Sequence, residues 1–354
     1  MTILITGGAG FVGSSLALAF AREGAGHDII AFDNLRRRGG EFNLPLLKAA
    51  GVKFVHGDIR QPGDLEDLEG HFDVLIEASA EPSVHAGMTG GPGYVLGTNL
   101  TGTLNCLEFA RRRAGGFVFL STSRVYAIAA LRAVVLDEEA SRFTLSSGQK
   151  QAGVSVQGVS EAFSTEGQRS FYGASKLASE LVIQEYASAY GLPCVVNRCG
   201  VIAGPGQWGK TDQGVFSLWV AHHFFGKPLK YTGFGGTGKQ VRDLLHPLDL
   251  YDLLKIQLAR LAPGDVSAHN VGGGLAGSVS LREWTEFCRE VTGHEVEIPG
   301  DPSTAAVDVP SYISDTRAIT LATGWEPRRS PQEIARDVAD WLRENRTFLA
   351  GFFA

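Results

Sequence analysis

The sequence predicts an α/β protein built on a doubly wound parallel sheet, with a smaller α/β domain in its C-terminal part. Three observations support this: apolar runs alternate with segments of helical periodicity, a glycine-rich turn follows the first run, and an acidic residue ends the second. Such alternation is typical of βαβ units, whose helices cover both faces of a parallel sheet. With 354 residues and 44% hydrophobic content, the chain is long enough for this core and a companion domain.

The strands and helices are expected in alternating order along the chain. Strands are expected in the apolar runs 2–6, 28–32, 52–55, 73–77, 116–121 and 194–198. Helical spacing of apolar residues predicts helices at 14–22, 95–112, 174–190, 280–291 and 331–344. The stretch 141–170, rich in Ser, Gly and Gln, has little periodicity and is predicted to be a long loop.

These elements predict two domains. Residues 1–199 form the first domain, to which residues 241–272 return, and residues 200–240 and 273–346 form the smaller one. Residues 347–354 are an apolar tail, expected to dock on the core or on a second subunit rather than on a membrane.

The first glycine turn predicts a dinucleotide site. Gly7, Gly10 and Gly13 follow the first apolar run and open a helix, with a spacing slightly wider than G-x-G-x-x-G. The first glycine turns the chain sharply, the second lets backbone N–H groups approach a pyrophosphate, and the third lets helix and strand pack closely. The first domain is therefore expected to be of the Rossmann type.

Asp33 ends the second apolar run about 20 residues further on, where an acidic side chain hydrogen-bonds the ribose hydroxyls of the cofactor. It favours NAD over NADP, because a carboxylate would repel the 2′-phosphate of NADP. The arginines at 36–38 favour NADP instead, since an arginine at this place can bind the 2′-phosphate. NAD is the stronger interpretation.

A tyrosine and a lysine are the candidate reacting groups. Tyr172 and Lys176 are four residues apart and so lie on one face of a helix, while Thr122 follows the strand at 117–120. A free tyrosine has a pKa of about 10, and lowering it by about three units takes about 4 kcal/mol, which Lys176 and the positive nicotinamide can supply. We expect Tyr172 to take a proton from a sugar hydroxyl while hydride passes to NAD, with Thr122 holding the alkoxide oxygen.

In this chain order the motifs resemble the extended short-chain dehydrogenase/reductase family, whose sugar-nucleotide members carry them over nearly the whole length seen here. The resemblance implies bound NAD and a C-terminal domain that binds a nucleoside diphosphate sugar. Besides the residues above, it assigns to the cofactor Phe11, Val12, Asn34, Asp58, Ile59, Ala78, Ser79, Ala80 and Asn99. To the substrate it assigns Thr122, Ser123, Arg124, Gln213, Val241 and Arg242, of which Arg242 would bind the diphosphate.

The residues after Thr122 bear on the reaction. Dehydratases and decarboxylases of this family carry a carboxylate there, whereas this chain has Ser123-Arg124, so epimerisation or net dehydrogenation is expected. Residues 32–35, 211–214, 238–243 and 270–274 resemble the subgroup that epimerises CDP-paratose and CDP-tyvelose at C2. Val201 fits this subgroup, because C4-epimerases usually carry an asparagine there.

Some positions depart from the family pattern. Glu77-Ala78-Ser79-Ala80 replaces the usual His-Leu-Ala-Gly or His-Leu-Ala-Ala, Ala127 replaces a glycine, and Cys199 with Gly200 replaces larger or polar residues. A different sugar or nucleotide therefore stays open. Two alternatives remain: a UDP-hexose C4-epimerase, and a non-catalytic NAD-binding protein that regulates or scaffolds. The intact Thr122, Tyr172 and Lys176 count against the second.

The composition of the chain argues against several classes of function. A net charge of −6 and a pI near 5.9 offer no basic surface for nucleic acid or anionic lipid. The four cysteines show no C-x-x-C spacing, which predicts reduced thiols in a cytoplasmic protein and no metal site. No apolar run reaches the roughly 18 residues of a membrane span. The family resemblance implies a homodimer or homotetramer, joined through the helices at 95–112 and 174–190.

Overall fold

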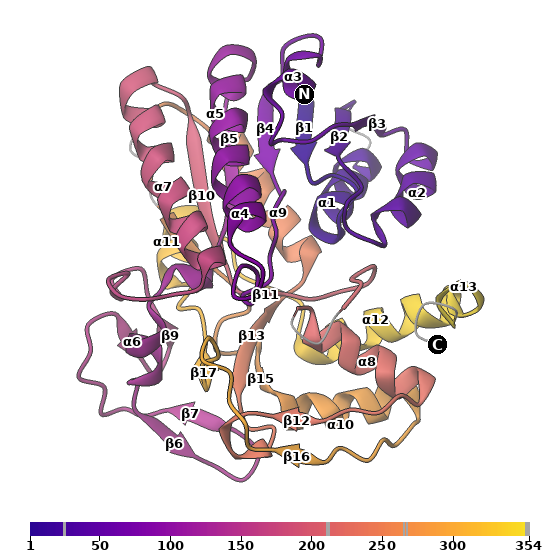
Figure 1. The fold of residues 1–354 in the computed structure, drawn as a ribbon, viewed down its shortest axis with the longest axis vertical. Coiled ribbons are helices and arrows are strands. Elements are labelled where there is room, and N and C mark those ends of the chain that lie inside the picture. Colours follow the sequence, from indigo (N-terminus) through magenta and orange to yellow (C-terminus); the bar gives the residue numbers. More distant parts are fainter. Residues whose placement is uncertain (24–25, 210–212, 265, 267, 351–354) are drawn as a thin grey trace. The chain divides into compact units, whose positions relative to one another are not determined.

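The computed structural model describes residues 1–23, 26–209, 213–264, 266 and 268–350 (Figure 1). The chain divides into two compact units. The first consists of residues 1–125, 170–198 and 250–269. The second consists of residues 126–169, 199–249 and the chain from 270 onward. Each unit has its own sheet and helices and is described separately.

A seven-stranded parallel sheet forms the centre of the first unit. Its order is β14-β10-β5-β4-β1-β2-β3, in which the chain winds outward in both directions from β1 and β4. The strands are β1 (Thr2–Thr6), β2 (Asp28–Asp33), β3 (Lys53–His56), β4 (Val74–Glu77), β5 (Phe117–Thr122), β10 (Cys194–Cys199) and β14 (Ala268–Val271). This is the doubly wound sheet that the sequence predicts, and each expected strand forms within two residues of its expected bounds.

Helices cover this sheet. They are α1 (Phe11–Arg22), α2 (Leu44–Ala49), α3 (Pro62–Glu66), α4 (Gly93–Leu96), α5 (Gly102–Arg113), α7 (Phe171–Tyr190) and α9 (Pro247–Ala259). One hydrophobic cluster joins the sheet to α5 and α7 through Leu75, Phe117, Phe119, Leu107 and Ile183. The helix expected at 95–112 is interrupted, because residues 97–101 form a π-helix between α4 and α5. Such single π turns are common at functional sites.

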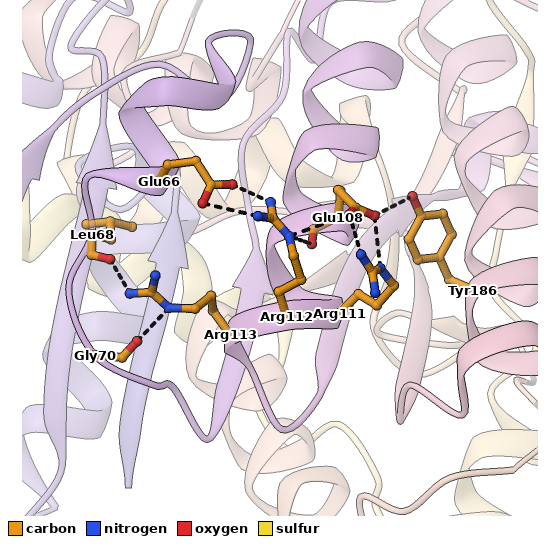
Figure 2. A network of polar contacts seen from close by, with 8 residues as sticks. All are labelled: Glu66, Leu68, Gly70, Glu108, Arg111, Arg112, Arg113 and Tyr186. Atoms are coloured by element: carbon orange, nitrogen blue, oxygen red, sulfur yellow. Dashed lines mark hydrogen bonds and ion pairs between the residues drawn. The ribbon is translucent and has the colours of Figure 1, made fainter.

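The end of α5 is fixed by a polar network, shown in Figure 2. The arginines at 111–113 occupy its last turn, where cations are favoured by the helix dipole. Arg112 forms an ion pair with Glu66 of α3, and Glu108 accepts a hydrogen bond from the Tyr186 hydroxyl of α7 at 3.3 Å. The network therefore connects α5 to α3 and to α7.

The second unit contains a four-stranded sheet, in which β13 pairs with β11, β15 and β17. Three helices, α8, α10 and α12, pack against one another, and serine–glutamate capping boxes begin α10 and α12. The strands are β11 (Val201–Ile202), β12 (Tyr231–Thr232), β13 (Val241–Leu245), β15 (Ser278–Ser280), β16 (Gly300–Asp301) and β17 (Ser311–Tyr312). The helices are α6 (Ile128–Arg132), α8 (Val215–Phe225), α10 (Leu281–Thr292), α11 (Arg317–Thr323), α12 (Pro331–Glu344) and α13 (Arg346–Ala350).

The segment 141–170 differs from the expected long loop. Strand β6 (Leu136–Glu138) pairs with β7 (Phe143–Leu145), and β8 (Val154–Ser155) pairs with β9 (Gly158–Val159). Strands of two or three residues are too short to produce a periodic pattern, so they cannot be recognised from the sequence. The compact units also divide the chain at residues other than those expected. Residues 126–169 belong to the second unit, and of the returning segment only 250–269 belong to the first.

The C-terminal helix α13 docks within the second unit. Leu349 is fully buried, and the ring of Phe348 lies edge-on to Trp208 with 6.2 Å between centroids. Of the apolar tail expected at 347–354, residues 351–354 lie outside the described residues. Among the described residues, no helix has the length and apolar character needed to cross a membrane. All four cysteines are free thiols.

Candidate functional site

The glycine turn between β1 and α1 requires glycine on steric grounds. Gly7 has a φ of +65°, and a Cβ there would lie 2.8 Å from the carbonyl carbon and oxygen of Ala78 and from the Ser79 nitrogen. A Cβ on Gly13 would lie 2.1 Å from the Gly7 oxygen. The turn is therefore pressed against the loop that follows β4, and only glycine allows this approach. Ala78 and Ser79, two predicted cofactor residues, lie beside it.

The N-terminus of α1 lies immediately after this turn. Gly10 is its N-cap residue, and no side chain caps the helix. The first backbone N–H groups of a helix, here at Phe11, Val12 and Gly13, have no partner within the helix, and they carry its positive dipole end. A glycine-rich turn that leads into an uncapped helix N-terminus fits the pyrophosphate of a dinucleotide.

Asp33, at the end of β2, is fixed beside the same turn. Its Oδ2 accepts a hydrogen bond from the backbone N–H of Ala9 at 3.1 Å, and its Oδ1 accepts one from Leu35 at 2.7 Å. Burial raises the pKa of Asp33, while these backbone N–H groups partly oppose the shift. Each carboxylate oxygen has a further lone pair, so the ribose hydroxyls of a dinucleotide could still bind here.

Asp58, which the family resemblance places near the adenine, is engaged in an ion pair. Arg60 donates to both of its carboxylate oxygens, with Nε 3.0 Å from Oδ1, and Asn34 donates to Oδ2 at 2.9 Å. The hydrogen bonds from Arg60 are the main cause that lowers the Asp58 pKa to about 2. The guanidinium groups of Arg36 and Arg60 lie 4.1 and 5.0 Å from the centroid of the Tyr94 ring. Asp58 and Arg36 thus belong to one polar cluster at the end of β2.

Asn99 fixes the loop that follows β4. It is fully buried in the π-helix, where its Oδ1 accepts the Glu81 N–H at 2.7 Å and its Nδ2 donates to the Glu81 oxygen at 3.0 Å. Its own carbonyl accepts the Ser179 hydroxyl of α7 at 3.0 Å. Asn99 therefore supports residues 78–80 through the backbone of the next residue. Ile59 is buried beneath α5.

Tyr172 and Lys176 lie in the first two turns of α7. Ser170 caps this helix by accepting the Gly173 N–H at 3.2 Å, so the helix begins at Phe171, earlier than expected, and includes Tyr172. Lys176 is 1% exposed, and its Nζ lies 4.2 Å from the centroid of the Phe119 ring on β5. Burial beside an aromatic face is a strongly desolvated place for an ammonium group.

Thr122 is the last residue of β5, against which α7 packs. It is 6% exposed, and its Oγ1 accepts the backbone N–H of Arg124 at 3.2 Å. This bond occupies an acceptor position and leaves the hydroxyl proton available for donation. Ser123 and Arg124 continue into a 3₁₀ turn that also packs against α7. The first unit therefore brings together the predicted cofactor residues and the three predicted catalytic residues.

The remaining predicted substrate residues lie in the second unit. Val241 is buried in β13, and Gln213 lies just before α8, whereas Thr211 and Asp212 lie outside the described residues. The Arg242 guanidinium binds the Asp308 carboxylate and the Val309 carbonyl, both at 2.8 Å. Arg242, the residue expected to bind the substrate diphosphate, is therefore bonded to other groups of the protein in this structure.

Two residues of interest have no role predicted from the sequence. Glu77 stands out there only as a departure from the family pattern, yet it is a fully buried carboxyl group at the end of β4. Asp308 pairs with Arg242, and the sequence holds no signal for it because the two are 66 residues apart. Only the three-dimensional structure shows this pair.

Comparisons with known proteins agree with this geometry. The profile of the NAD dependent epimerase/dehydratase family matches residues 3–272. A CDP-paratose 2-epimerase from Salmonella typhi is 31% identical, with 96% of this chain and 99% of that protein covered. A dTDP-glucose 4,6-dehydratase from Xanthomonas campestris is 27% identical, with 99% and 95% covered. The solved structure of Thermus thermophilus UDP-glucose 4-epimerase in complex with NAD has a TM-score of 0.75 at 26% identity and covers 97% of this chain and 99% of that one.

Proposed function

The chain belongs to the NAD dependent epimerase/dehydratase family, and from this we infer that it is an isomerase that epimerises a nucleoside diphosphate sugar. We propose NAD as its cofactor and a CDP-linked sugar, inverted at C2, as its substrate. The relative from Salmonella typhi, which matches nearly the full length of both chains, supports the choice of CDP and C2. The glycine turn, the uncapped start of α1 and Asp33 fit a bound NAD.

One observation carries this proposal. Tyr172 and Lys176 lie one turn apart on α7, which packs against the strand that Thr122 ends, in the same unit as the glycine turn. A base, a cation that favours its ionised form and a hydrogen-bond donor are the groups that oxidation of an alcohol needs. A non-catalytic NAD-binding protein would need none of them.

The roles of the three residues rest on their chemistry. When bound, NAD would supply reversible hydride transfer at the sugar carbon that is inverted. Tyr172, ionised beside the buried Lys176 ammonium, takes the proton of the sugar hydroxyl and gives it back when the hydroxyl is restored. Thr122 donates its free proton to the same oxygen, where negative charge develops in the transition state.

The two residues after Thr122 favour epimerisation over dehydration. Elimination of water needs a second acid or base near the ketone, and Ser123 and Arg124 offer none. Arg242 is the proposed ligand of the substrate diphosphate, since a guanidinium can bind phosphate oxygens with two parallel hydrogen bonds. To do so it would exchange its bond to Asp308 for one to the substrate.

We also propose that the protein is a cytoplasmic homodimer or homotetramer whose subunits meet through α5 and α7. These helices expose large apolar residues: Leu104 is 36% exposed, Leu181 57% and Tyr190 59%. Four free cysteines suit a reducing compartment.

The experiment is an incubation of the NAD-loaded protein with CDP-, UDP- and dTDP-linked hexoses in D2O, followed by NMR of each product. We expect inversion at C2 of a CDP-linked sugar, without deuterium from the solvent. Inversion at C4 of a UDP-hexose would replace the substrate assignment with the rival one. Loss of water would make the protein a dehydratase, and no product from any sugar, with NAD bound, would support a non-catalytic role.

A further inference from the structure

Glu77 is a buried carboxyl group within an apolar face of the parallel sheet. It ends β4, with Thr6 of β1 and Phe119 of β5 as its register neighbours, and it is fully buried. Leu75, two residues earlier on the same face of the strand, belongs to the hydrophobic cluster beneath α5 and α7. An ionised carboxylate is costly to bury in such a place unless its charge is paired and its lone pairs are satisfied.

The hydrogen bonds around Glu77 fit a protonated carboxyl group. The Thr103 hydroxyl lies 2.7 Å from Glu77 Oε1 and 2.8 Å from the Asn99 carbonyl oxygen. A hydroxyl has one proton, so it can donate to only one of these two acceptors. If Glu77 carries a proton and donates it to Thr103, the threonine is free to donate to Asn99, and both contacts are hydrogen bonds. Glu77 Oε2, which is also buried, has no hydrogen-bond partner among the described residues.

The titratable groups that face Glu77 come from two helices. Phe119, the register neighbour of Glu77 on β5, has the Lys176 Nζ of α7 4.2 Å from its ring centroid, so the lysine charge acts on Glu77. Cys106 of α5 also interacts with it. Burial raises the pKa of Glu77 to about 7, and this rise is moderated by the charge of Lys176 and by the hydrogen bond that Thr103 can donate to the ionised form. Burial also raises the Cys106 pKa well above its ordinary value, so the thiol stays neutral. Thr6 and Phe119, from β1 and β5, carry no charge.

We propose that Glu77 is a positioning residue that holds a proton beside Lys176 and thereby sets how much of the lysine charge is available to stabilise ionised Tyr172. The inference rests on the proposed function, because it assumes that Tyr172 works as the base. With Glu77 neutral, this carboxyl group does not offset the Lys176 charge. With Glu77 ionised, the two form a buried pair whose net charge is zero. Ionisation of Tyr172 then becomes less favourable, and its titration extends to higher pH.

The test follows both side chains by NMR in the NAD-loaded, full-length protein, labelled with 13C at glutamate Cδ and tyrosine Cζ. Glu77→Gln assigns the glutamate signal, and Tyr172→Phe assigns the tyrosine signal. We expect Glu77 to titrate near neutral pH. In Glu77→Gln, which is neutral at every pH, the Tyr172 midpoint should fall by about one pH unit relative to the wild type. Glu77→Asp, which keeps a titrating carboxyl group, should restore the wild-type midpoint.

A control tests the sign of the coupling. Lys176→Met removes the cation and should move the Glu77 midpoint upward, because in the wild type the lysine charge lowers the Glu77 pKa. An unchanged Tyr172 midpoint in Glu77→Gln, or a Glu77 that is ionised from pH 5 upward, would overturn the proposal. A merely structural Glu77 would change thermal stability or NAD affinity without moving either midpoint.

These midpoints need no substrate, so they separate this inference from the proposed function. If the protein epimerises no sugar but the midpoints shift as expected, the proposed function fails while the coupling of Glu77 to Lys176 stands. If epimerisation is found and the midpoints stay fixed, only the role of Glu77 fails. Should Glu77→Gln not fold, Glu77→His, which restores the residue usual in the family, provides the assignment and the charge test.

Discussion

The carboxylate of Asp33 and the backbone N–H of Ala9 form a 3.1 Å hydrogen bond that joins the end of β2 to the glycine turn. The other carboxylate oxygen holds Leu35, whose φ of 52° is rare for a residue with a side chain. One side chain thus fixes the two backbone segments that would surround the adenosine ribose. Cofactor affinity should depend on it more than on any other acidic group of the strand.

Replacing Asp33 with asparagine should weaken NAD binding by about tenfold or more. A charge-assisted hydrogen bond contributes about 1.5–3 kcal/mol, and each 1.4 kcal/mol is a factor of ten in affinity. Preference for NAD over NADP should also fall, because the charge that repels a 2′-phosphate is removed. Titration calorimetry of the cofactor-free protein measures both. Asp28→Asn, at the exposed start of the same strand, is the control and should bind NAD as the wild type does. Equal affinities in the two variants would contradict this role.

Replacing Tyr172 with phenylalanine should lower turnover at least 100-fold and leave NAD bound, because a positioned acid or base contributes about 10²–10⁴-fold. The assay compares product formation with the cofactor content of the purified protein. Tyr186→Phe is the matched control on the same helix, since its hydroxyl donates to Glu108 near the end of α5. The assignment of the base is wrong if Tyr172→Phe retains full turnover.

Replacing Arg242 with alanine should weaken binding of CDP by about tenfold or more, since the lost bonds to phosphate are charge-assisted. Calorimetric titration with CDP measures this without any reaction. Arg343→Ala, which removes an exposed pair with Asp340 on α12, should leave the affinity unchanged. If CDP binds Arg242→Ala as tightly as the wild type, another group holds the diphosphate.

The stability of the protein should depend on pH through His246. Its Nδ1 accepts the Leu248 N–H at 3.1 Å, and burial, followed by the charge of Arg329, lowers its pKa to about 4. An unfolded chain has an ordinary histidine pKa of about 6.5. Between pH 6.5 and pH 4, the unfolded chain therefore binds a proton on this histidine that the folded protein does not bind. Folding stability should fall by about 2 kcal/mol between pH 7 and pH 5 from this residue alone.

The contribution of His246 is measured by urea unfolding of the wild type and His246→Gln at pH 7 and pH 5. The stability difference between the two proteins should shrink as the pH falls, because only the wild type loses the histidine contribution. A difference that stays constant between pH 7 and pH 5 would show that folding does not lower the pKa of His246.

The parallel sheet was predictable because its strands are apolar runs long enough to be recognised, and because the glycine turn and Asp33 have fixed places in such a sheet. The same holds for Tyr172 and Lys176, whose spacing places both on one helix face. The short strands of 141–170 and the π turn at Asn99 were missed, since neither has a periodic signature. Nor can a sequence show that Asp308 holds Arg242, because the pairing depends on tertiary structure.

The central claim is that one hydride leaves and returns to the same sugar carbon, with Tyr172 moving the proton. The most direct measurement uses a CDP-linked sugar deuterated at C2 and tracks the label in the product by NMR and mass spectrometry. We expect the inverted product to keep its deuterium at C2 when the reaction is run in ordinary water. Replacement of the label by solvent hydrogen would show that the carbon is deprotonated instead, and would contradict this mechanism.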